Sequence, residues 1–267
     1  MFSAHEPRRA SSSRWAVTFC MPPTVSSQAS ATANSQAQPA GTVAVFLLAD
    51  IAPRHRLWGY ARFVVGRFAM RGVPGLVMSK VMGSGDGGGF GLKPSNSRQA
   101  LFCLFTDEAS ADAFLKSPTA QAYEQRAQEF CSAKLRAYSC KGEWSGQSIA
   151  VTADTPESGS GPIATLTRAS IRPMSALRFW RMQPASEVSL NAASGCLLAT
   201  GIGEAPLFRQ ATFSLWVNSA AMDTYARTGA HLAAIRAAHD GSFFSESMFA
   251  RFVPLSLAGR WRGRQYG

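Results

Sequence analysis

The amino-acid sequence predicts an α+β fold in which two similar halves form a pseudo-dimeric barrel with antiparallel sheets. The segment "ALFCLFTDEASADAFLKSPTAQAYEQRA" recurs 111 residues later as "ATFSLWVNSAAMDTYARTGAHLAAIRAA", and "KGEWSG" recurs as "AGRWRG". Both halves also show the same succession of strand, helix, two strands, helix and strand, which is the ferredoxin-like unit. Self-similarity at a fixed spacing indicates a duplicated structural unit, so we expect tandem ferredoxin-like repeats.

The first predicted repeat occupies residues 41–150. It begins with the apolar strand "TVAVFLLADI", followed by the helix "RHRLWGYARFVVGRFAM". A strand near Ser79–Met82, a glycine-rich bend and a strand at Gln99–Thr106 come next. The following helix is broken at Ser117-Pro118, because proline is disfavoured inside a helix. A last strand is expected around Ala133–Ser139.

The second predicted repeat occupies residues 151–267. Its strands are "PIATLTRASI", "GCLLATGI", "QATFSLWV" and "MFARFVPL", with a short helix near Ser175–Met182 and a second helix broken at Thr228-Gly229. This copy is about six residues longer, and "DGSFFSES" is the expected place for them. Residues 1–40 are rich in Ser, Ala, Gln, Pro and Arg without a continuous apolar run, which predicts a disordered tail and not a secretory signal.

Composition narrows the function classes. The net charge is +11, although only 16% of the residues are charged and 46% are hydrophobic. A basic, apolar chain favours an anionic membrane surface or an acidic cofactor group as a partner. Nucleic acid is not predicted, because neither a Lys/Arg tail nor a zinc-finger spacing occurs. Five cysteines without a C-x-x-C pair indicate free thiols in a reducing compartment.

Motifs of protein-only catalysis are missing from the sequence. "GSGDGG" at Gly83–Gly88 matches the dinucleotide pattern, but the following "GFGLKPS" cannot open a helix, which favours a bend over a phosphate loop. No G-x-S-x-G or H-E-x-x-H occurs, and four scattered histidines cannot build a three-histidine metal site. An enzyme of this sequence would therefore depend on a bound cofactor for its chemistry.

His231 is the candidate ligand. The first half carries Ala120 at the matching position, which suits a duplicated scaffold with one ligand site, although ordinary divergence explains the difference equally well. On a helical wheel His231 lies at the margin of the apolar stripe and not at its centre. His239, which matches Gln128, is expected at the helix end, where a cation suits the helix dipole.

Two elements that carry arginines are candidates for binding anionic partners, one a membrane surface and the other carboxylates. In the helix Arg56–Arg71, one arc holds Leu57, Trp58, Ala61, Val64, Val65 and Phe68, and the other holds arginines mixed with Tyr60, Phe63 and Met70. Aromatic residues among arginines on an outer face are typical of a membrane interface, or of an ordinary solvated basic face. In "LTRASIRP", Arg168 and Arg172 fall on one strand face and could clamp carboxylates. Charges on an edge strand would look the same.

Several long motifs are similar to those of one enzyme family. They occur in order from Gly41 to Arg264 as "KVMGSGDGGGFGLKPS", "KGEWSG", "GPIATLTRASIRP", "LRFWR", "GIGEAPLFRQATFSLW", "YARTGAHLAAIR" and "ESMFARFVPLSLAGRWRG". On these motifs the chain resembles the spheroidene monooxygenase family, the acyclic carotenoid 2-ketolases. The resemblance implies oxidation of C-2 of spheroidene-type carotenoids to a ketone with O2 and reduced ferredoxin, with haem as the proposed cofactor.

The resemblance also implies roles for individual residues. The family's histidine in "TG-x-H" matches His231, which we expect to be the axial ligand of the haem iron. Arg168, Arg172 and Arg236 lie in matching motifs and would contact the propionates or act electrostatically. We expect the side chains that line the substrate pocket or core to be Phe102, Phe213 and Trp216.

Partners and alternatives follow from the same resemblance. The expected partners are an apolar carotenoid, ferredoxin and the membrane surface, the last through the Arg56–Arg71 helix. We expect a cytoplasmic protein associated peripherally with the inner membrane, and an oligomer is left open. "AAHDGSFFSES" departs from the family's more acidic run with a Trp, and this departure leaves room for a different substrate. The alternatives are an oxygenase of another apolar isoprenoid-like substrate and a non-enzymatic haem or carotenoid carrier.

Overall fold

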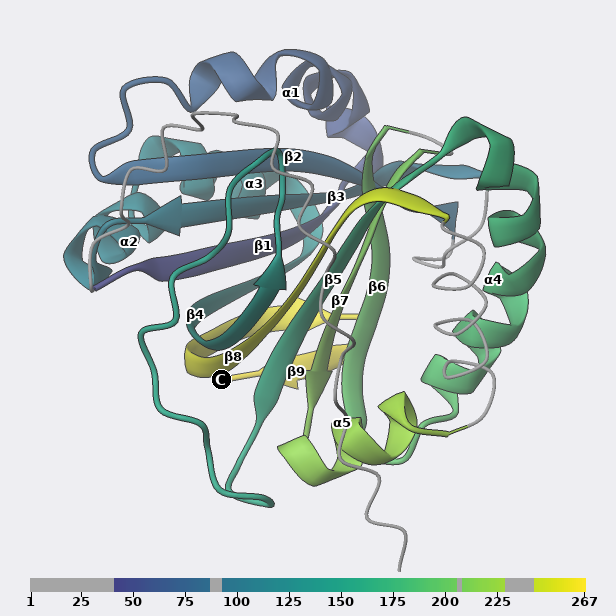
Figure 1. The fold of residues 1–267 in the computed structure, drawn as a ribbon. Helices are drawn as coiled ribbons and strands as arrows, with labels where there is room; N and C mark the ends of the chain where they lie inside the picture. Colours follow the sequence, from purple (N-terminus) through teal and green to yellow (C-terminus); the bar gives the residue numbers. More distant parts are fainter. Residues whose placement is uncertain (1–40, 87–92, 206–207, 229–242) are drawn as a thin grey trace, which may run out of the picture. The chain divides into compact units, whose positions relative to one another are not determined.

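One antiparallel sheet organises the part of the chain that the computed structural model describes, residues 41–267 without 87–92, 206–207 and 229–242. The order of its nine strands is β4-β1-β3-β2-β6-β7-β5-β8-β9, and β4 also pairs with β8. The first eight strands therefore close into a barrel, and β9 pairs with the end of β8 (Figure 1). The predicted α+β class with antiparallel strands is confirmed.

The two halves of the chain contribute four barrel strands each. The strands of the first half are β1 (Val43–Ile51), β2 (Leu76–Gly85), β3 (Pro94–Phe105) and β4 (Ala127–Gly142). The second half provides β5 (Ile163–Ile171), β6 (Cys196–Ala205), β7 (Arg209–Trp216), β8 (Phe244–Trp261) and the short β9 (Arg264–Tyr266). In each half the fourth strand is followed across the sheet by the first, third and second.

The halves are joined along two seams. At one seam Gly83 and Ser84 of β2 pair with Gly203 and Ile202 of β6. At the other, β4 pairs with β8 over a long ladder that ends at Gly142 and Met248. The predicted glycine-rich bend is therefore corrected at Gly83–Gly85, which belongs to β2. The cause is tertiary, since β6 supplies a partner strand that local turn propensity does not reveal.

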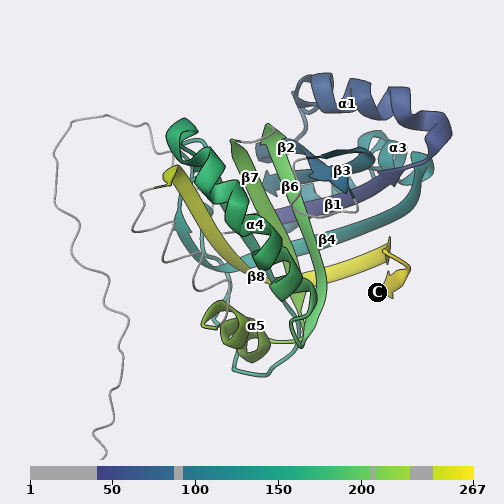
Figure 2. The same cartoon turned by 90° about the vertical axis from the view of Figure 1, so that its right-hand side faces the viewer.

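Helices cover the outside of each half. The first half carries α1 (Arg56–Ala69), α2 (Glu108–Leu115) and α3 (Pro118–Arg126), and the second carries α4 (Ala176–Asn191) and α5 (Ser219–Ala226) (Figures 1 and 2). The helix break at Ser117-Pro118 is confirmed, because Ser117 caps α3 by accepting the Ala120 N–H. The predicted break at Thr228-Gly229 extends beyond the described residues.

Alternating side chains divide the core into an inner and an outer part. Strand β1 is buried along its whole length, with Phe46 and Leu48 inside the barrel and Val45 and Leu47 beneath the helices. Phe46 stacks on Phe213 of the other half, with ring centroids 3.9 Å apart. Burial of each such side chain contributes about 2–3 kcal/mol, so the interior itself holds the halves together.

Helix α1 packs on the sheet through its small residues. A Cβ at Gly66 would lie 3.2 Å from Val81 Cγ2, and one at Gly59 would lie 3.1 Å from Gln99 Nε2. Met70 is buried on the same side. Most of the apolar arc consequently faces outward, with exposed fractions of 86% for Leu57 and 71% for Val64. Trp58 of the same arc packs against the core beside Tyr123. The expectation that the face with Phe63 and Met70 lies outside is wrong for Met70, because glycines bring that side against the sheet.

Candidate active site in the barrel interior

The barrel interior is apolar over most of its length. Phe102 and Phe213, two of the predicted pocket residues, both point into it. Phe102 stacks on Trp144 with centroids 5.5 Å apart, while Phe213 stacks on Phe46. Trp216, the third predicted pocket residue, packs instead on the outer side of the sheet against Tyr225. It belongs to the core beneath the helices and not to the barrel interior.

Charged side chains gather around Trp144 at one end of the interior. Arg168 is only 3% exposed and pairs with Glu246, and its Nη2 lies 3.9 Å from Glu204 Oε2. Its guanidinium also lies over the Trp144 ring, 5.8 Å from the centroid. Lys80 approaches the same ring at 5.4 Å. We call these four charged residues around Trp144 the ionic cluster.

Hydrogen bonds and ion pairs connect the members of the ionic cluster, and Arg168 Nε alone among its atoms is buried without a hydrogen-bond partner in the described part of the chain. Trp144 Nε1 donates to Glu204 Oε2 at 2.8 Å, and Lys80 Nζ lies 3.5 Å from Glu204 Oε1. Lys80 Nζ also donates to Ser145 Oγ at 2.7 Å. Two cations and two carboxylates balance each other, which is the condition under which a buried ion pair is tolerated. The cluster therefore fills its end of the barrel with charged groups of balanced sign.

Glu246 is the titratable member that the surroundings shift. Burial on its own would raise its pKa, but the N–H groups of Gly146 and Ser145 and the Arg168 guanidinium favour the carboxylate. Together they hold the pKa of Glu246 below its ordinary value of 4.5. Glu246 is therefore a carboxylate at neutral pH, and its charge keeps Arg168 paired.

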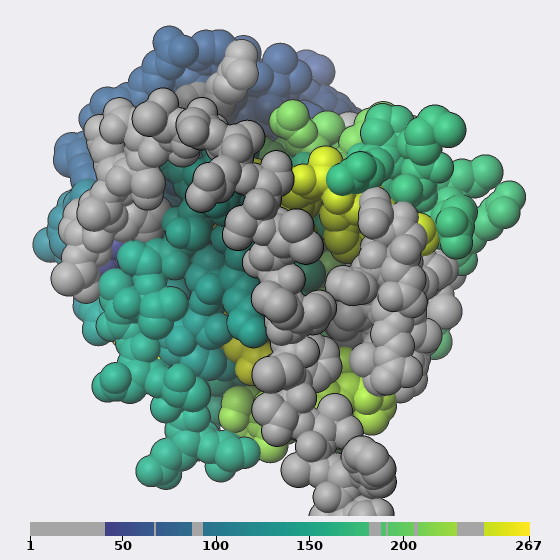
Figure 3. All heavy atoms as spheres, in the orientation of Figure 1, coloured from purple at the N-terminus to yellow at the C-terminus, as the bar shows by residue number. Residues whose placement is uncertain are grey.

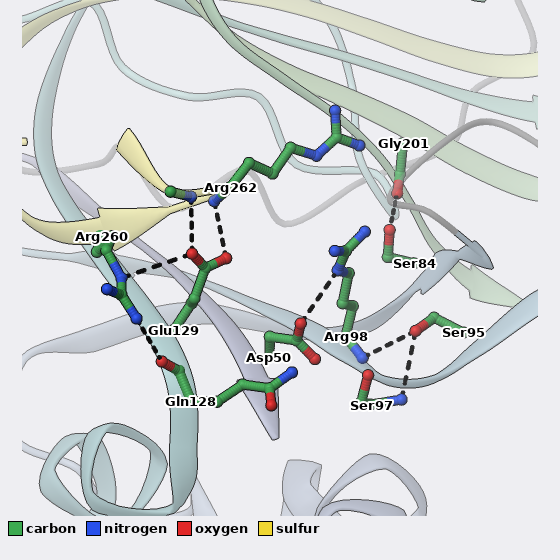
Figure 4. A network of polar contacts seen from close by, with 11 residues as sticks. Asp50, Ser84, Ser95, Ser97, Arg98, Gln128, Glu129, Gly201, Arg260 and Arg262 are labelled. Atoms are coloured by element: carbon green, nitrogen blue, oxygen red, sulfur yellow. Dashed lines mark hydrogen bonds and ion pairs between the residues drawn. The ribbon is translucent and has the colours of Figure 1, made fainter. Parts of the chain in front are cut away.

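The opposite end of the interior surrounds Trp261. Arg98 lies over this indole at 5.7 Å from the ring centroid, and its Nε is 3.4 Å from Asp50 Oδ2. Figure 4 shows Arg98 pointing toward Asp50, with Ser84 beyond it donating to the carbonyl of Gly201 at 2.7 Å. Nearby, Glu129 accepts the N–H of Arg262 and Gly263. This second polar group, the Trp261 end, is built from both halves of the chain.

The predicted cofactor residues are only partly described. His231, His239 and Arg236 lie outside the described residues. Arg172 follows β5, is exposed, and donates from Nε to the carbonyl of Phe244. Arg168 already has carboxylate partners in Glu246 and Glu204, so a propionate would have to displace one of them. Of the two predicted clamp residues, Arg168 is therefore buried and paired, and Arg172 is exposed beyond the end of β5.

Metal and thiol chemistry is limited in the described part of the chain. Within it, His, Cys, Asp and Glu form no group of three or more that could hold a metal ion. Four of the five predicted thiols, Cys103, Cys131, Cys140 and Cys196, are free, and Cys20 lies outside the described residues. Burial raises their pKa values, to about 12 for Cys131 and about 11 for Cys196. These cysteines are protonated at neutral pH and are poor nucleophiles.

Sequence reasoning noticed Trp144 and Trp261 only as markers of the duplication. Both indoles are fully buried, and each has a charged residue over its ring. The sequence feature that could have indicated these residues is a tryptophan present in both copies next to charged residues, in "KGEWSG" and "AGRWRG". Asp50, Arg98 and Glu204 gave no comparable signal, because their strands bring them together over distances that local patterns do not encode.

The fold and site define a closed antiparallel α+β barrel with an apolar interior and a polar group at each end. A solved aldoxime dehydratase shares this fold, with a TM-score of 0.51, 10% identity, and coverage of 85% of this chain and 89% of that one. No family model matches the chain.

Two curated relatives identify the family. The chain is 56% identical to the spheroidene monooxygenase of Rubrivivax gelatinosus over 85% of its own length and 88% of the relative's. It is 33% identical to that of Rhodobacter capsulatus over 78% of its length and 87% of the relative's. The chain belongs to the spheroidene monooxygenase family and is a monooxygenase, which confirms the resemblance inferred from the motifs.

Proposed function

We propose that this monooxygenase oxidises C-2 of an acyclic, spheroidene-type carotenoid to a ketone in carotenoid biosynthesis, using O2 and reduced ferredoxin. The observation that carries the proposal is the 56% identity to a relative named spheroidene monooxygenase. The apolar interior supports it, because long apolar ligands are held by hydrophobic and aromatic side chains with few polar groups. Phe46, Phe102 and Phe213 supply such aromatic surface.

We also propose haem as the cofactor, with His231 as the axial ligand. Haem iron needs only one axial ligand from the protein, and when bound it would supply the activation of dioxygen. The match of "TGAH" to the family's histidine segment supports His231. The equivalent Ala120 of the first half is buried on the inner side of α3. Arg172 and Arg236 remain the proposed propionate contacts.

We propose a peripheral attachment to the membrane through α1. No helix in the described ranges is long and apolar enough to cross a membrane. Leu57, Val64 and Phe68 are exposed on α1, with Arg56 and Arg71 also exposed. Leu177 of α4, equivalent to Leu57, is exposed too, and α1 and α4 both lie at the surface in Figure 3. Apolar side chains among arginines bind the interface of anionic bilayers, here the cytoplasmic side of the inner membrane.

We propose, finally, that residues 41–150 and 151–267 are tandem ferredoxin-like repeats. The same strand order in each half supports this. Equivalent helix caps do so as well, since Asp107 accepts the Ser110 N–H and Asn218 accepts the Ala221 N–H. The predicted tail, residues 1–40, lies outside the described residues.

Product analysis tests the catalytic proposal. The full-length protein would be expressed in cells that make spheroidene or neurosporene, with ferredoxin and its reductase supplied. We expect a ketone at C-2 of the carotenoid, absent from cells with an empty vector. Unchanged carotenoids would overturn the proposed substrate and favour another apolar isoprenoid. Carotenoid bound to the purified protein without any oxygenated product would favour a carrier.

A further inference from the structure

Trp144 and Trp261 are equivalent residues whose surroundings differ. The register of each half aligns three further positions at the two ends of the interior. These pairs are Arg168 and Leu48, Lys80 and Thr200, and Glu204 and Ser84. At each pair the Trp144 end carries a large charged side chain, and the Trp261 end carries a smaller neutral one. The Trp261 end is consequently less filled by the chain's own polar groups.

Polar atoms at the Trp261 end are buried without hydrogen-bond partners among the described residues. They are Trp261 Nε1, Thr200 Oγ1, Asp50 Oδ1 and Arg98 Nη1. Trp261 and Thr200 are at most 1% exposed. A buried polar atom without a partner costs about 1–3 kcal/mol, so such a group points to a ligand that satisfies it.

The contrast with Trp144 shows why these atoms are free. Trp144 Nε1 donates to Glu204, but the equivalent Ser84 already donates its hydroxyl to Gly201 O. Thr200 precedes that glycine on the interior-facing side of β6, where Leu198 and Ile202 are its neighbours. Asp50 lies opposite Arg98 in the β1–β3 register. It is on the same face of β1 as the interior residues Phe46 and Leu48.

We propose that the Trp261 end binds an oxygen function at the end of the apolar substrate, a hydroxyl, ether or carbonyl group. The inference rests on the proposed function for the apolar part of the ligand. The indole N–H and the Arg98 guanidinium donate to the ligand oxygen, and Asp50 Oδ1 or Thr200 Oγ1 accepts from a hydroxyl. The remaining apolar chain of the ligand lies along the interior toward Phe46 and Phe213. At the other end, the ionic cluster provides partners for Trp144 Nε1, Glu204 and Glu246, and Arg168 Nε is the cluster atom that is buried without a hydrogen-bond partner among the described residues.

Binding to two matched carotenoids tests this proposal. Full-length protein would be immobilised and equilibrated with neurosporene or 1-hydroxyneurosporene in detergent micelles, and bound carotenoid would be measured by absorption. We expect the hydroxylated carotenoid to bind roughly tenfold more tightly, as about two net hydrogen bonds provide. Thr200→Val and Trp261→Phe, which keep most of the apolar volume, should each reduce the preference severalfold.

Trp144→Phe is the matched control, because it removes the equivalent indole N–H at the Trp144 end and should leave the preference unchanged. Equal binding of the two carotenoids by the wild-type protein would overturn the proposal. So would a preference that survives both Thr200→Val and Trp261→Phe, since the unpaired atoms would then hold water only. The assay needs no turnover, so a preference without oxygenated product would disprove the proposed function alone.

Discussion

Glu129 and Glu246 occupy equivalent positions 117 residues apart, and each carboxylate accepts backbone hydrogen bonds from a turn in the other half. Glu129 of β4 accepts from Gly263 at 2.7 Å, and Glu246 of β8 accepts from Gly146 at 3.0 Å. Each glycine follows a non-glycine residue with positive φ, and at Arg262 that angle is 51°. The two halves therefore exchange equivalent contacts at both ends of the β4–β8 seam.

Removing one of these carboxylates should destabilise the protein. Glu129→Ala leaves the N–H groups of Arg262 and Gly263 without their acceptor and releases a turn held in a left-handed conformation. We expect the free energy of unfolding to fall by about 1–3 kcal/mol, measured by urea denaturation. Glu124→Ala on the exposed face of α3 is the control, with an expected change within about 0.5 kcal/mol. Equal effects of the two variants would show that the exchanged contact is unimportant.

Acid should weaken the Glu246 contact in a defined direction. The folded state lowers the pKa of Glu246 below its ordinary value of 4.5. Its contribution to stability is therefore complete above pH 4.5 and is lost as the pH falls through the lower folded-state pKa. We expect Glu246→Gln to flatten the loss of stability on acidification, measured by urea unfolding at a series of pH values. Glu157→Gln, at an exposed loop position, should keep the wild-type slope, and parallel slopes for all three proteins would contradict the assignment.

Because Trp216 lies outside the barrel interior, its substitution should affect the stability of the protein more than its turnover. Trp216 Nε1 donates to Ser214 Oγ at 2.9 Å on the outer side of the sheet, so Trp216→Phe should cost about 1 kcal/mol of stability. Product formed per folded molecule should stay within about twofold. Phe213→Leu, inside the barrel, removes the stack on Phe46 and should lower the product formed per folded molecule severalfold. The product would be measured by carotenoid chromatography, and the amount of folded protein by circular dichroism. A larger loss of product in Trp216→Phe than in Phe213→Leu would place the substrate on the outer side of the sheet.

Much of the fold was predictable because the duplication repeats local signals. The break before Pro118 and the strand-helix succession follow from backbone chemistry that acts within a few residues. The longer extent of β4 was not predictable, since Ala127–Gly142 is a strand along its whole length through pairing with β1 and β8. Alternating polar residues at its ends carry no apolar signal of their own.

The outward face of α1 shows a second limit of sequence reasoning. A helical wheel separates two arcs but does not say which one meets the sheet, and apolar content favours the wrong one here. Gly59 and Gly66 decide the packing, because they let the helix approach Ile51 and Val81 closely. Similarly, the sequence predicts that Arg168 binds the carboxylate of a ligand. In the structure Arg168 is instead paired with Glu246, a residue distant in sequence.

Membrane binding should depend on the exposed arc of α1. The double substitution Leu57→Ser and Val64→Ser removes two exposed apolar side chains without disturbing the buried face. Because full burial of each is worth about 1.5–3 kcal/mol, even partial burial of the two side chains should make the variant bind anionic vesicles at least about tenfold more weakly, measured by flotation. Val151→Ser, at a residue that is 54% exposed outside the helices, is the matched control. Vesicles of neutral lipid should bind the wild-type protein more weakly than anionic vesicles do. If the double variant still bound anionic vesicles as well as the wild type, α1 would be excluded as the attachment site.

The axial-ligand proposal for His231 has a spectroscopic test that does not depend on turnover. Purified full-length protein reconstituted with haem should show a Soret band shifted from that of free haem, because an axial protein ligand changes the electronic environment of the iron. His231→Ala should shift or abolish that band and weaken haem retention on a desalting column. His55→Ala is the control, since His55 precedes α1 and contacts the exposed Arg54 side chain. A Soret band unchanged in His231→Ala would show that another residue holds the iron and would exclude His231 as the ligand. The carotenoid proposal would not be affected, because the product assay tests it separately.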